Sequence, residues 1–329
     1  MDVSIIIVNY NTPEMVIDCI NSVQAQTKEI SYEIIVVDNG SQDDSLDIFG
    51  DKISEAAIII NAGENLGFGK ANNLGAKYAQ GKYLLLLNSD TLLVNNAIRL
   101  LMEFLTDHSD VGVVGGNLYT INMTASSSFC MSFDDVDSVK RDSNWRPILN
   151  KIIKNRRIDR IADKELRDRE IFAENFNFSG SPQKVAYVFG TDMFLRRELF
   201  EKAGGFDPEF FMYAEEEELS ARITDMGYEI WSVPEAQIIH FDGGTFKNKD
   251  EFSERQYRMR LNGAFIYYKK RFGLDGAQKY YYYKRKKLHR LIYLARLFRR
   301  QALFSLSEGQ LRCLESAYRE FIGVNGAEV

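Results

Sequence analysis

Short apolar runs alternate with helical patterns over about the first 116 residues. The run from Val3 to Val8 is uninterrupted and rich in β-branched residues, which is typical of a strand covered on both faces. Further apolar runs that we interpret as strands occupy residues 34–37, 57–60, 83–87 and 111–115. Apolar residues at helical spacing lie near 13–23, 70–79 and 95–107. This alternation predicts an α/β fold with a mostly parallel central sheet flanked by helices, whose ligands bind at the carboxyl ends of the strands.

Residues 120–184 interrupt this alternation. The stretch from 151 to 170 is crowded with charges of both signs, which indicates a solvated helix and loop rather than core. Regular patterning returns at 185–240, and from about residue 255 the chain becomes helical and basic. We therefore expect an α/β domain over residues 1–250, with an insertion at about 120–184, and a basic helical extension over residues 251–329.

Composition narrows the class of protein. The chain has 329 residues, 45% of them hydrophobic, and 41 Lys and Arg against 47 Asp and Glu, a net charge of -6 that argues against nucleic-acid binding. Cys19, Cys130 and Cys313 are too widely spaced for a disulfide framework or a zinc site, so we expect a reducing, cytoplasmic location. We expect neither a membrane span nor a signal peptide, because no run reaches about 18 apolar residues and no basic region precedes the first one.

Polar side chains follow several predicted strands at the edge where a ligand would bind. Asp38 can accept a hydrogen bond from a nucleobase or a ribose hydroxyl, although Asp-Asn-Gly-Ser is equally a turn and a helix cap. Asp90 follows the fourth strand and is suited to hold Mg²⁺ or Mn²⁺ on a diphosphate. His240 follows another apolar run and could complete this metal site, although a lone histidine is more often structural.

Two further segments carry candidate chemistry. Glycines at 63, 67 and 69 precede a predicted helix whose N-terminus favours anions, but their spacing is not the dinucleotide fingerprint and also suits a plain glycine-rich loop. Glu215 to Glu218 open another predicted helix, where the macrodipole favours ionised carboxylates. Some of these glutamates need only be solvated, but we expect one to be a general base, because clustered like charges raise pKa values towards neutrality.

In combination these segments resemble the family-2 inverting glycosyltransferases of GT-A fold, especially the bacterial rhamnosyltransferase-like branch. The resemblance covers residues 3–242 and rests on segments in the family's order at 8–11, 37–41, 65–73, 88–90, 190–191, 204–207, 215–216 and 233–240. It implies transfer of a sugar from a UDP- or TDP-linked donor to the hydroxyl of a glycan or lipid-linked acceptor. The reaction would serve bacterial surface polysaccharide synthesis and would use Mn²⁺ or Mg²⁺.

The resemblance also implies a role for each matching residue. Glu216 would be the catalytic base, with Glu215 beside it as the fallback. Asp38 would contact the uracil or thymine base. The nucleotide and donor pocket would include Asn9, Tyr10, Asn65, Gly67, Asn72 and Ser89. Gly190, Thr191 and Asp192 would border the acceptor, and Asp90 and His240 would bind the metal.

Two departures from the family pattern keep alternatives open. Asn88 stands where many relatives have Asp, and Glu216 stands where Asp is common. A catalytically weak or inactive nucleotide-sugar-binding module is therefore one alternative. A sugar-nucleotide nucleotidyltransferase is another, but it should carry a glycine-rich phosphate loop with Lys or Arg directly after the first strand, and residues 9–13 offer neither.

The basic extension suggests a second contact. Between Gly276 and Ser307 there is no acidic residue, while nine Lys and Arg residues and four consecutive tyrosines occur there. Apolar residues follow helical spacing at Leu288, Leu291, Ile292, Ala295 and Phe298. Residues 276–300 are therefore expected either to lie peripherally on the anionic inner face of the cell membrane or to pack on the main domain or on a second subunit of a homo-oligomer.

Overall fold

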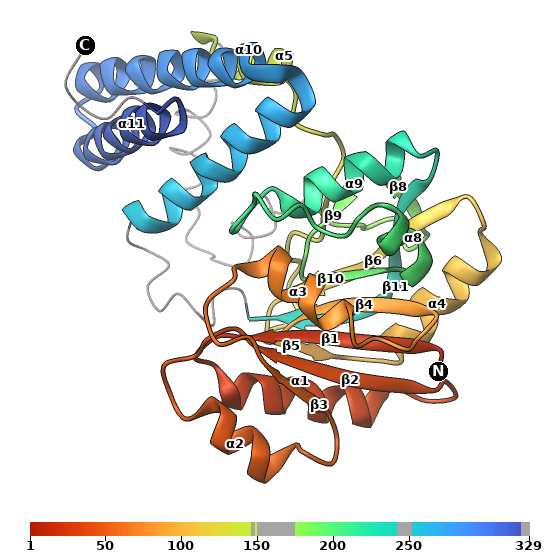
Figure 1. Cartoon of the computed structure of the whole chain (residues 1–329). Coiled ribbons are helices and arrows are strands. Elements are labelled where there is room, and N and C mark those ends of the chain that lie inside the picture. Colours follow the sequence, from red (N-terminus) through yellow and green to blue (C-terminus); the bar gives the residue numbers. More distant parts are fainter. Residues whose placement is uncertain (146–148, 150–174, 242–251, 324–329) are drawn as a thin grey trace. The chain divides into compact units, whose positions relative to one another are not determined.

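The computed structural model describes residues 1–145, 149, 175–241 and 252–323. These residues belong to two compact units, which differ in their architecture (Figure 1). Among the described residues, unit 1 comprises 1–133, 175–211 and 215–241, and unit 2 comprises 134–145, 149, 212–214 and 252–323. Unit 2 thus takes in part of the expected insertion as well as the C-terminal helices. The charged stretch 151–170 lies outside the described residues.

A nine-stranded sheet forms the centre of unit 1, in the order β3-β2-β1-β4-β10-β6-β11-β5, with β8 pairing to β11. Its strands are β1 (Val3–Asn9), β2 (Tyr32–Asp38), β3 (Ile58–Asn61), β4 (Tyr83–Asn88), β5 (Thr91–Leu93), β6 (Val111–Tyr119), β8 (Gln183–Val185), β10 (Asp192–Arg196) and β11 (Glu229–His240). A two-stranded sheet pairs β7 (Phe129–Cys130) with β9 (Tyr187–Val188). The helices of this unit are α1 (Pro13–Gln26), α2 (Ser45–Lys52), α3 (Phe68–Ala76), α4 (Ala97–Asp107), α8 (Arg197–Lys202) and α9 (Glu215–Asp225).

The predicted α/β fold is confirmed, and the central sheet is mostly parallel apart from the three antiparallel strands β5, β8 and β10. Strands β1 to β4 run parallel, as the alternation of strands and helices predicts. Strand β10 is antiparallel to both β4 and β6, and β5 and β8 are antiparallel to β11. The direction of β10 could not be predicted, because a short buried apolar run has the same composition in either orientation.

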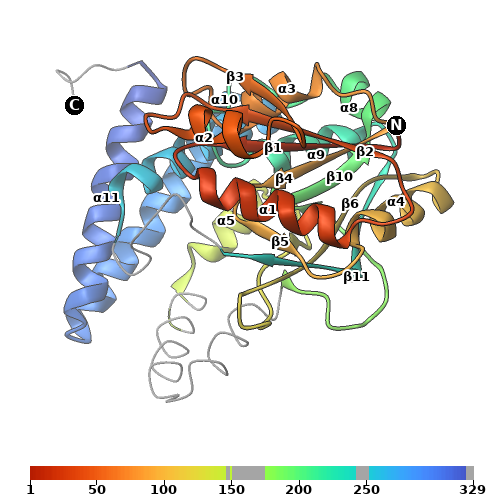
Figure 2. The same ribbon diagram turned by 90° about the horizontal axis from the view of Figure 1, so that it is seen from below.

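Side chains of the central strands alternate between two cores. Ile5 and Ile7 face a core that includes Val16, Ile20 and Leu101 from α1 and α4, and these helices cover one side of the sheet (Figure 2). Ile6 faces the other core, in which Ala71 of α3 and Leu219 of α9 are buried. Both faces of β1 are therefore covered, which explains its uninterrupted apolar sequence.

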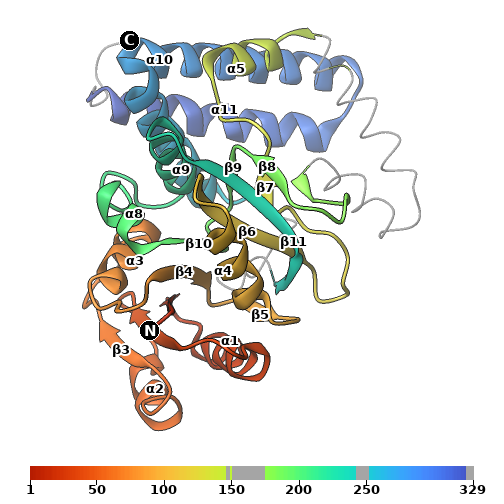
Figure 3. The same ribbon diagram turned by 90° about the vertical axis from the view of Figure 1, so that its right-hand side faces the viewer.

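Unit 2 consists of α5 (Val136–Asp142), α10 (Glu254–Leu297) and α11 (Gln301–Phe321), and α11 packs along α10 (Figure 3). Helix α10 changes direction at Gly273, whose φ of 70° lies outside the helical region. Hydrogen bonds from the hydroxyls of Tyr267 and Tyr268 to the carbonyls of Asp134 and Asp135 hold the start of α5 on α10.

Most of the predicted apolar stripe is buried inside unit 2. Leu288, Leu291 and Ala295 are at most 8% exposed, and Cys313 and Leu314 of α11 are buried as well, whereas Ile292 is half-buried and Phe298 is 40% exposed. The three buried residues of the stripe therefore pack within unit 2, in which α11 lies along α10. In the part of the chain that the structure describes, no helix is long and apolar enough to cross a membrane.

Candidate active site

The ends of β1 and β2 form the first part of the site. Asn9 and Asp38 are paired residues at the last positions of these parallel strands. The Asn9 amide donates hydrogen bonds to Asp38 Oδ2 (2.8 Å) and to Ser41 Oγ (2.9 Å), and the Ser41 N–H donates to Asp38 Oδ1 (3.1 Å). Each carboxylate oxygen of the buried Asp38 thus has one protein donor and can accept a further hydrogen bond from a ligand.

Asn39 fixes the predicted donor loop to the end of β2. Its Oδ1 accepts from the Leu66 N–H (2.8 Å), and its Nδ2 donates to Asn65 Oδ1 (3.2 Å) and to the Gly67 carbonyl (3.4 Å). Asn65 Oδ1 also accepts from the Gly67 N–H (3.0 Å). The structure therefore assigns Asn39 a positioning role that the sequence analysis missed, although it directly follows Asp38.

Three other predicted donor residues lie in different surroundings. Ser89 Oγ lies 3.4 Å from Thr12 Oγ1, and Thr12 in turn donates to Asn9 Oδ1 (3.2 Å), which connects the ends of β4 and β1. Tyr10 is half-buried directly after β1. Asn72 is buried, and its amide donates to the Phe68 carbonyl (3.1 Å) within α3.

Asp90 and His240, the predicted metal ligands, come together where β11 ends and β5 begins. His240 pairs with Thr91 in this ladder, and His240 Nε2 lies 3.3 Å from Asp90 Oδ1, with both side chains 14% exposed. Among the described residues, no group of three or more His, Cys, Asp or Glu side chains is arranged to hold a metal ion. One carboxylate and one imidazole still fit a Mn²⁺ or Mg²⁺ ion that is shared with substrate phosphates, because such ions commonly keep few protein ligands.

Asp192, the third predicted acceptor residue, lies in the interior rather than at an accessible surface. It is fully buried; its Oδ2 accepts from the Gly116 N–H (2.6 Å), and its Oδ1 has no hydrogen-bond partner. Burial raises the pKa of Asp192 to about 7, an effect that the Gly116 N–H and the nearby His240 partly oppose.

The rest of the predicted acceptor turn lies between β4 and α3. The Asn88 N–H donates to the Thr191 carbonyl (2.9 Å). A Cβ at Gly190 would lie 2.9 Å from the ring of Phe68. The Phe68 ring also packs edge-on against Phe206, with centroids 5.8 Å apart. Phe68 therefore joins the donor loop, the acceptor turn and the segment before the acidic helix.

The acidic start of α9 contains two glutamates in contrasting environments. Glu215 is 3% exposed, and its Oε2 has no hydrogen-bond partner, whereas Glu216 is half-buried. The Cγ of Glu215 is near Gly69 of the donor segment, where an added Cβ would approach it to 3.7 Å. Burial raises the pKa of both carboxyl groups, and the charge of Glu216 raises that of Glu215 further.

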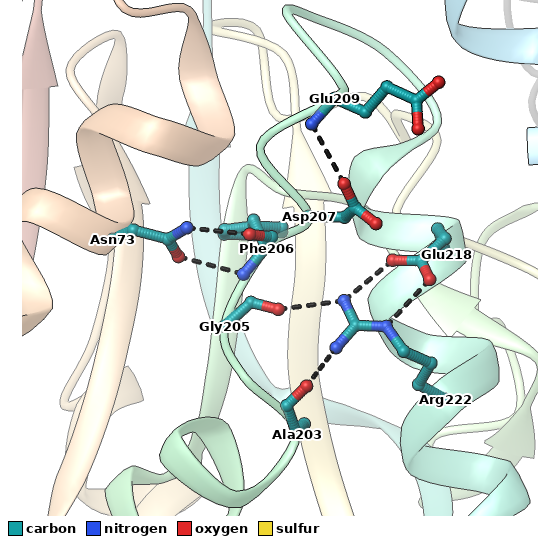
Figure 4. Close-up of polar contacts among 8 residues, drawn as sticks. All are labelled: Asn73, Ala203, Gly205, Phe206, Asp207, Glu209, Glu218 and Arg222. Atoms are coloured by element: carbon teal, nitrogen blue, oxygen red, sulfur yellow. Dashed lines mark hydrogen bonds and ion pairs between the residues drawn. The ribbon is translucent and has the colours of Figure 1, made fainter. Parts of the chain in front are cut away.

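Hydrogen bonds from α3 and α9 hold the loop that precedes these glutamates (Figure 4). Arg222 pairs with the buried Glu218 through two 2.7 Å contacts and also donates to the carbonyls of Gly205 (2.8 Å) and Ala203. Asn73 donates to the Phe206 carbonyl (2.7 Å) and accepts from the Phe206 N–H (2.9 Å). Glu218 is therefore a structural member of the glutamate run.

Comparison with known proteins finds a matching family model and individual relatives that are similar in sequence. The sequence model of Glycosyl transferase family 2 matches residues 4–204. Glycosyltransferase GlyG of Streptococcus pneumoniae serotype 4 is 24% identical over 203 residues, which are 61% of this chain and 58% of GlyG. Rhamnosyltransferase WbbL of Escherichia coli K12 is 24% identical over 273 residues, which are 80% of this chain and 92% of WbbL. The chain thus spans less than two thirds of GlyG but most of WbbL.

A solved structure gives the same fold. The mannosyltransferase PcManGT from Pyrobaculum calidifontis, in complex with GDP-Man and Mn²⁺, superposes with a TM-score of 0.57 at 14% identity, covering 98% of this chain and 86% of that one. The matched family region contains the strand ends that carry Asp38 and Asp90. The chain has the GT-A fold and belongs to Glycosyl transferase family 2.

Proposed function

We propose that this protein is an inverting glycosyltransferase that moves a sugar from a UDP- or TDP-linked donor to the hydroxyl of a glycan or lipid-linked glycan in bacterial surface polysaccharide synthesis. The observation that carries the proposal is that Asp38, held by Asn9 and Ser41, and the Asp90–His240 pair both lie at strand ends of one sheet. The similarity to a rhamnosyltransferase over most of its length supports a sugar transferase.

The donor nucleotide would bind along the ends of β1 and β2. The remaining acceptor positions of Asp38 suit a pyrimidine N–H, and the backbone of the loop held by Asn39 would lie near the sugar and phosphates. Asp90 and His240 would hold a divalent ion, and such an ion supplies charge neutralisation to the departing nucleoside diphosphate. The complex of PcManGT with GDP-Man and Mn²⁺ supports a metal-assisted donor site in this fold.

Glu216 is the better candidate for the base, because it is less buried than Glu215 and the pKa of Glu215 is raised more strongly, which favours its neutral form. Glu216 takes the proton of the acceptor hydroxyl, and the oxygen attacks the anomeric carbon from the face opposite the diphosphate. The bond to the diphosphate breaks, and the configuration inverts. The buried Glu215 favours its neutral form, which leaves the negative charge on Glu216, and the raised pKa of Glu216 brings it closer to the neutral range where a base works best.

The test is a screen of UDP- and TDP-sugars with Mn²⁺, read as released nucleoside diphosphate, on the wild type and on Glu216→Gln, Glu215→Gln and the exposed control Glu201→Gln. We expect Glu216→Gln to lower kcat by about 10²–10⁴-fold while it still binds UDP or TDP, because a general base contributes that much. The control should turn over as the wild type does.

Three outcomes would contradict parts of the proposal. Full turnover by Glu216→Gln would remove the assignment of the base. Binding of UDP or TDP without any transfer by the wild type would identify a non-catalytic binding module. Absence of nucleotide binding would remove the donor assignment.

A further inference from the structure

The face of α10 opposite its buried stripe carries a second pattern. Tyr282, Lys286, His289 and Tyr293 recur at intervals of four, three and four residues, which places them on one side of the helix. Tyr282 and Tyr293 are 58% and 59% exposed, although tyrosine is a large and partly apolar side chain. Their exposure indicates a contact site, because exposed apolar patches on a folded protein commonly mark surfaces that bind a partner.

These residues line a pocket that lies entirely within unit 2. Its volume is about 500 Å³, and its walls are Trp145, Tyr282, Arg285, Lys286, His289, Arg290 and Tyr293. We call Trp145, Tyr282, Lys286, His289, Arg290 and Tyr293 the aromatic–basic face.

Contacts within the aromatic–basic face order its side chains. The Arg290 guanidinium lies over the Trp145 ring at 4.9 Å and donates to the Ser143 carbonyl. Tyr293 meets the same indole edge-on, with centroids 5.9 Å apart. Trp145 is nevertheless 42% exposed. The pocket is thus preformed, and binding there would cost little side-chain ordering.

The pocket carries positive charge that the ion pairs among the described residues do not fully compensate. Arg285 pairs with Glu315 (3.0 Å), and Lys287 pairs with Asp142 (2.9 Å). No ion pair between residues that the structure describes engages Lys286 or Arg290. Because the sequence from Gly276 to Ser307 contains no acidic residue, an anionic partner is favoured.

We propose that the aromatic–basic face docks on an anionic phospholipid membrane, with a lipid phosphate in the pocket and the rings of Trp145, Tyr282 and Tyr293 at the depth of the headgroups. Tryptophan and tyrosine prefer this depth, because each combines an apolar ring with a polar tip. Lysine and arginine near an anionic leaflet add attraction to its surface potential. This face differs from the buried part of the apolar stripe, and the docking is independent of sugar transfer.

The experiment is flotation of the full-length protein with vesicles of phosphatidylcholine, with and without phosphatidylglycerol. The test variant is Lys286→Ala/Tyr293→Ala, and the matched control is Lys77→Ala/Tyr78→Ala, which removes an exposed lysine and an exposed tyrosine from unit 1. We expect the wild type and the control to float with anionic vesicles. The partition coefficient of the test variant should fall at least about fivefold, because one basic residue near an anionic membrane surface contributes about 1 kcal/mol to binding. Added NaCl should weaken the binding.

Any of these results would overturn the proposal: no flotation of the wild type with anionic vesicles, equal flotation with phosphatidylcholine alone, or equal partition of the test and control variants. Binding of inorganic phosphate without flotation would indicate a site for a soluble anion and would equally overturn it. Circular dichroism checks that the double variant keeps its helices, and the single variant Lys286→Gln gives the charge test if it does not. Because flotation requires no donor sugar, this result is separate from the test of sugar transfer.

Discussion

Replacement of Gly67 by alanine should damage the donor loop more than its size suggests. Gly67 has a φ of 81° and a ψ of 177°, a combination that is essentially restricted to glycine. A Cβ at this position would lie 2.1 Å from the Phe211 carbonyl oxygen. The same oxygen accepts the hydrogen bond from the Phe68 N–H (3.0 Å) at the start of α3.

Three costs add up in Gly67→Ala. The backbone conformation costs an alanine about 1–3 kcal/mol. Relief of the steric overlap costs about 1–3 kcal/mol, as for other overpacked sites. Displacement of the Phe211 carbonyl loses a hydrogen bond worth about 1 kcal/mol. The expected loss in the free energy of unfolding is therefore about 3–7 kcal/mol, together with weaker binding of the donor nucleotide.

Gly63→Ala is the matched control. Gly63 also has a positive φ, 76°, but no atom lies within 4 Å of an added Cβ, so only the conformational cost of about 1–3 kcal/mol applies. Urea unfolding followed by tryptophan fluorescence in a Trp145→Phe background would measure both variants, because Trp231 then reports on unit 1 alone. Equal unfolding midpoints for the two variants would refute the argument that the approach to Phe211 requires a glycine at position 67.

Three further predictions concern the site and its support. Asp38→Asn should weaken UDP binding by about 10–100-fold in calorimetry, because hydrogen bonds to a charged group contribute about 1.5–3 kcal/mol; unchanged affinity would show that Asp38 does not contact the nucleotide. Arg222→Ala should lower the free energy of unfolding by about 3–5 kcal/mol, because the buried Glu218 would lose its partner. In the same urea titration, loss of the two exposed ion pairs of Arg99, with Glu29 and Glu103, in Arg99→Ala should cost at most about 2 kcal/mol, and equal losses would contradict this account. The acidic limb of kcat/KM should have its midpoint above 4.5, because the base must be ionised and burial raises the pKa of Glu216; a limb at or below 4.5 would argue against Glu216.

The sequence was informative where the sheet is parallel and buried on both faces. Strands β1 and β4 were predicted to within one residue at each end and β2 to within two, because a strand between two layers of helices has to be apolar throughout. Strand β11 was harder to predict from the sequence, because its register shifts between Ser232 and Gln237 and it pairs with three different strands along its length. The membership of residues 134–145 in unit 2 had no local signal, since it depends on packing against α10.

In the candidate site, too, residues with a local sequence signal could be predicted, and residues that act through contacts distant in sequence could not. Asp38 and Asp90 could be predicted as site residues because residues at the carboxyl ends of parallel strands meet at one edge of the sheet. Asn39, Asn73 and Arg222 were missed as positioning residues, because each acts on backbone groups that are 17 to 133 residues away in sequence. The different burial of Glu215, which is buried, and Glu216, which is half-buried, could not be predicted within a run of identical residues.

The end of β11 also limits how this protein can vary in length. His240 stands at the third of three consecutive positions that pair with β5, next to Ile239, which also pairs with β6. Because side chains alternate between the two faces of a strand, one residue gained or lost between Gln237 and His240 would turn the imidazole away from Asp90. An insertion or deletion in this short stretch would therefore disturb the Asp90–His240 pair as much as replacement of the histidine. Homologues should differ in length in the loops instead.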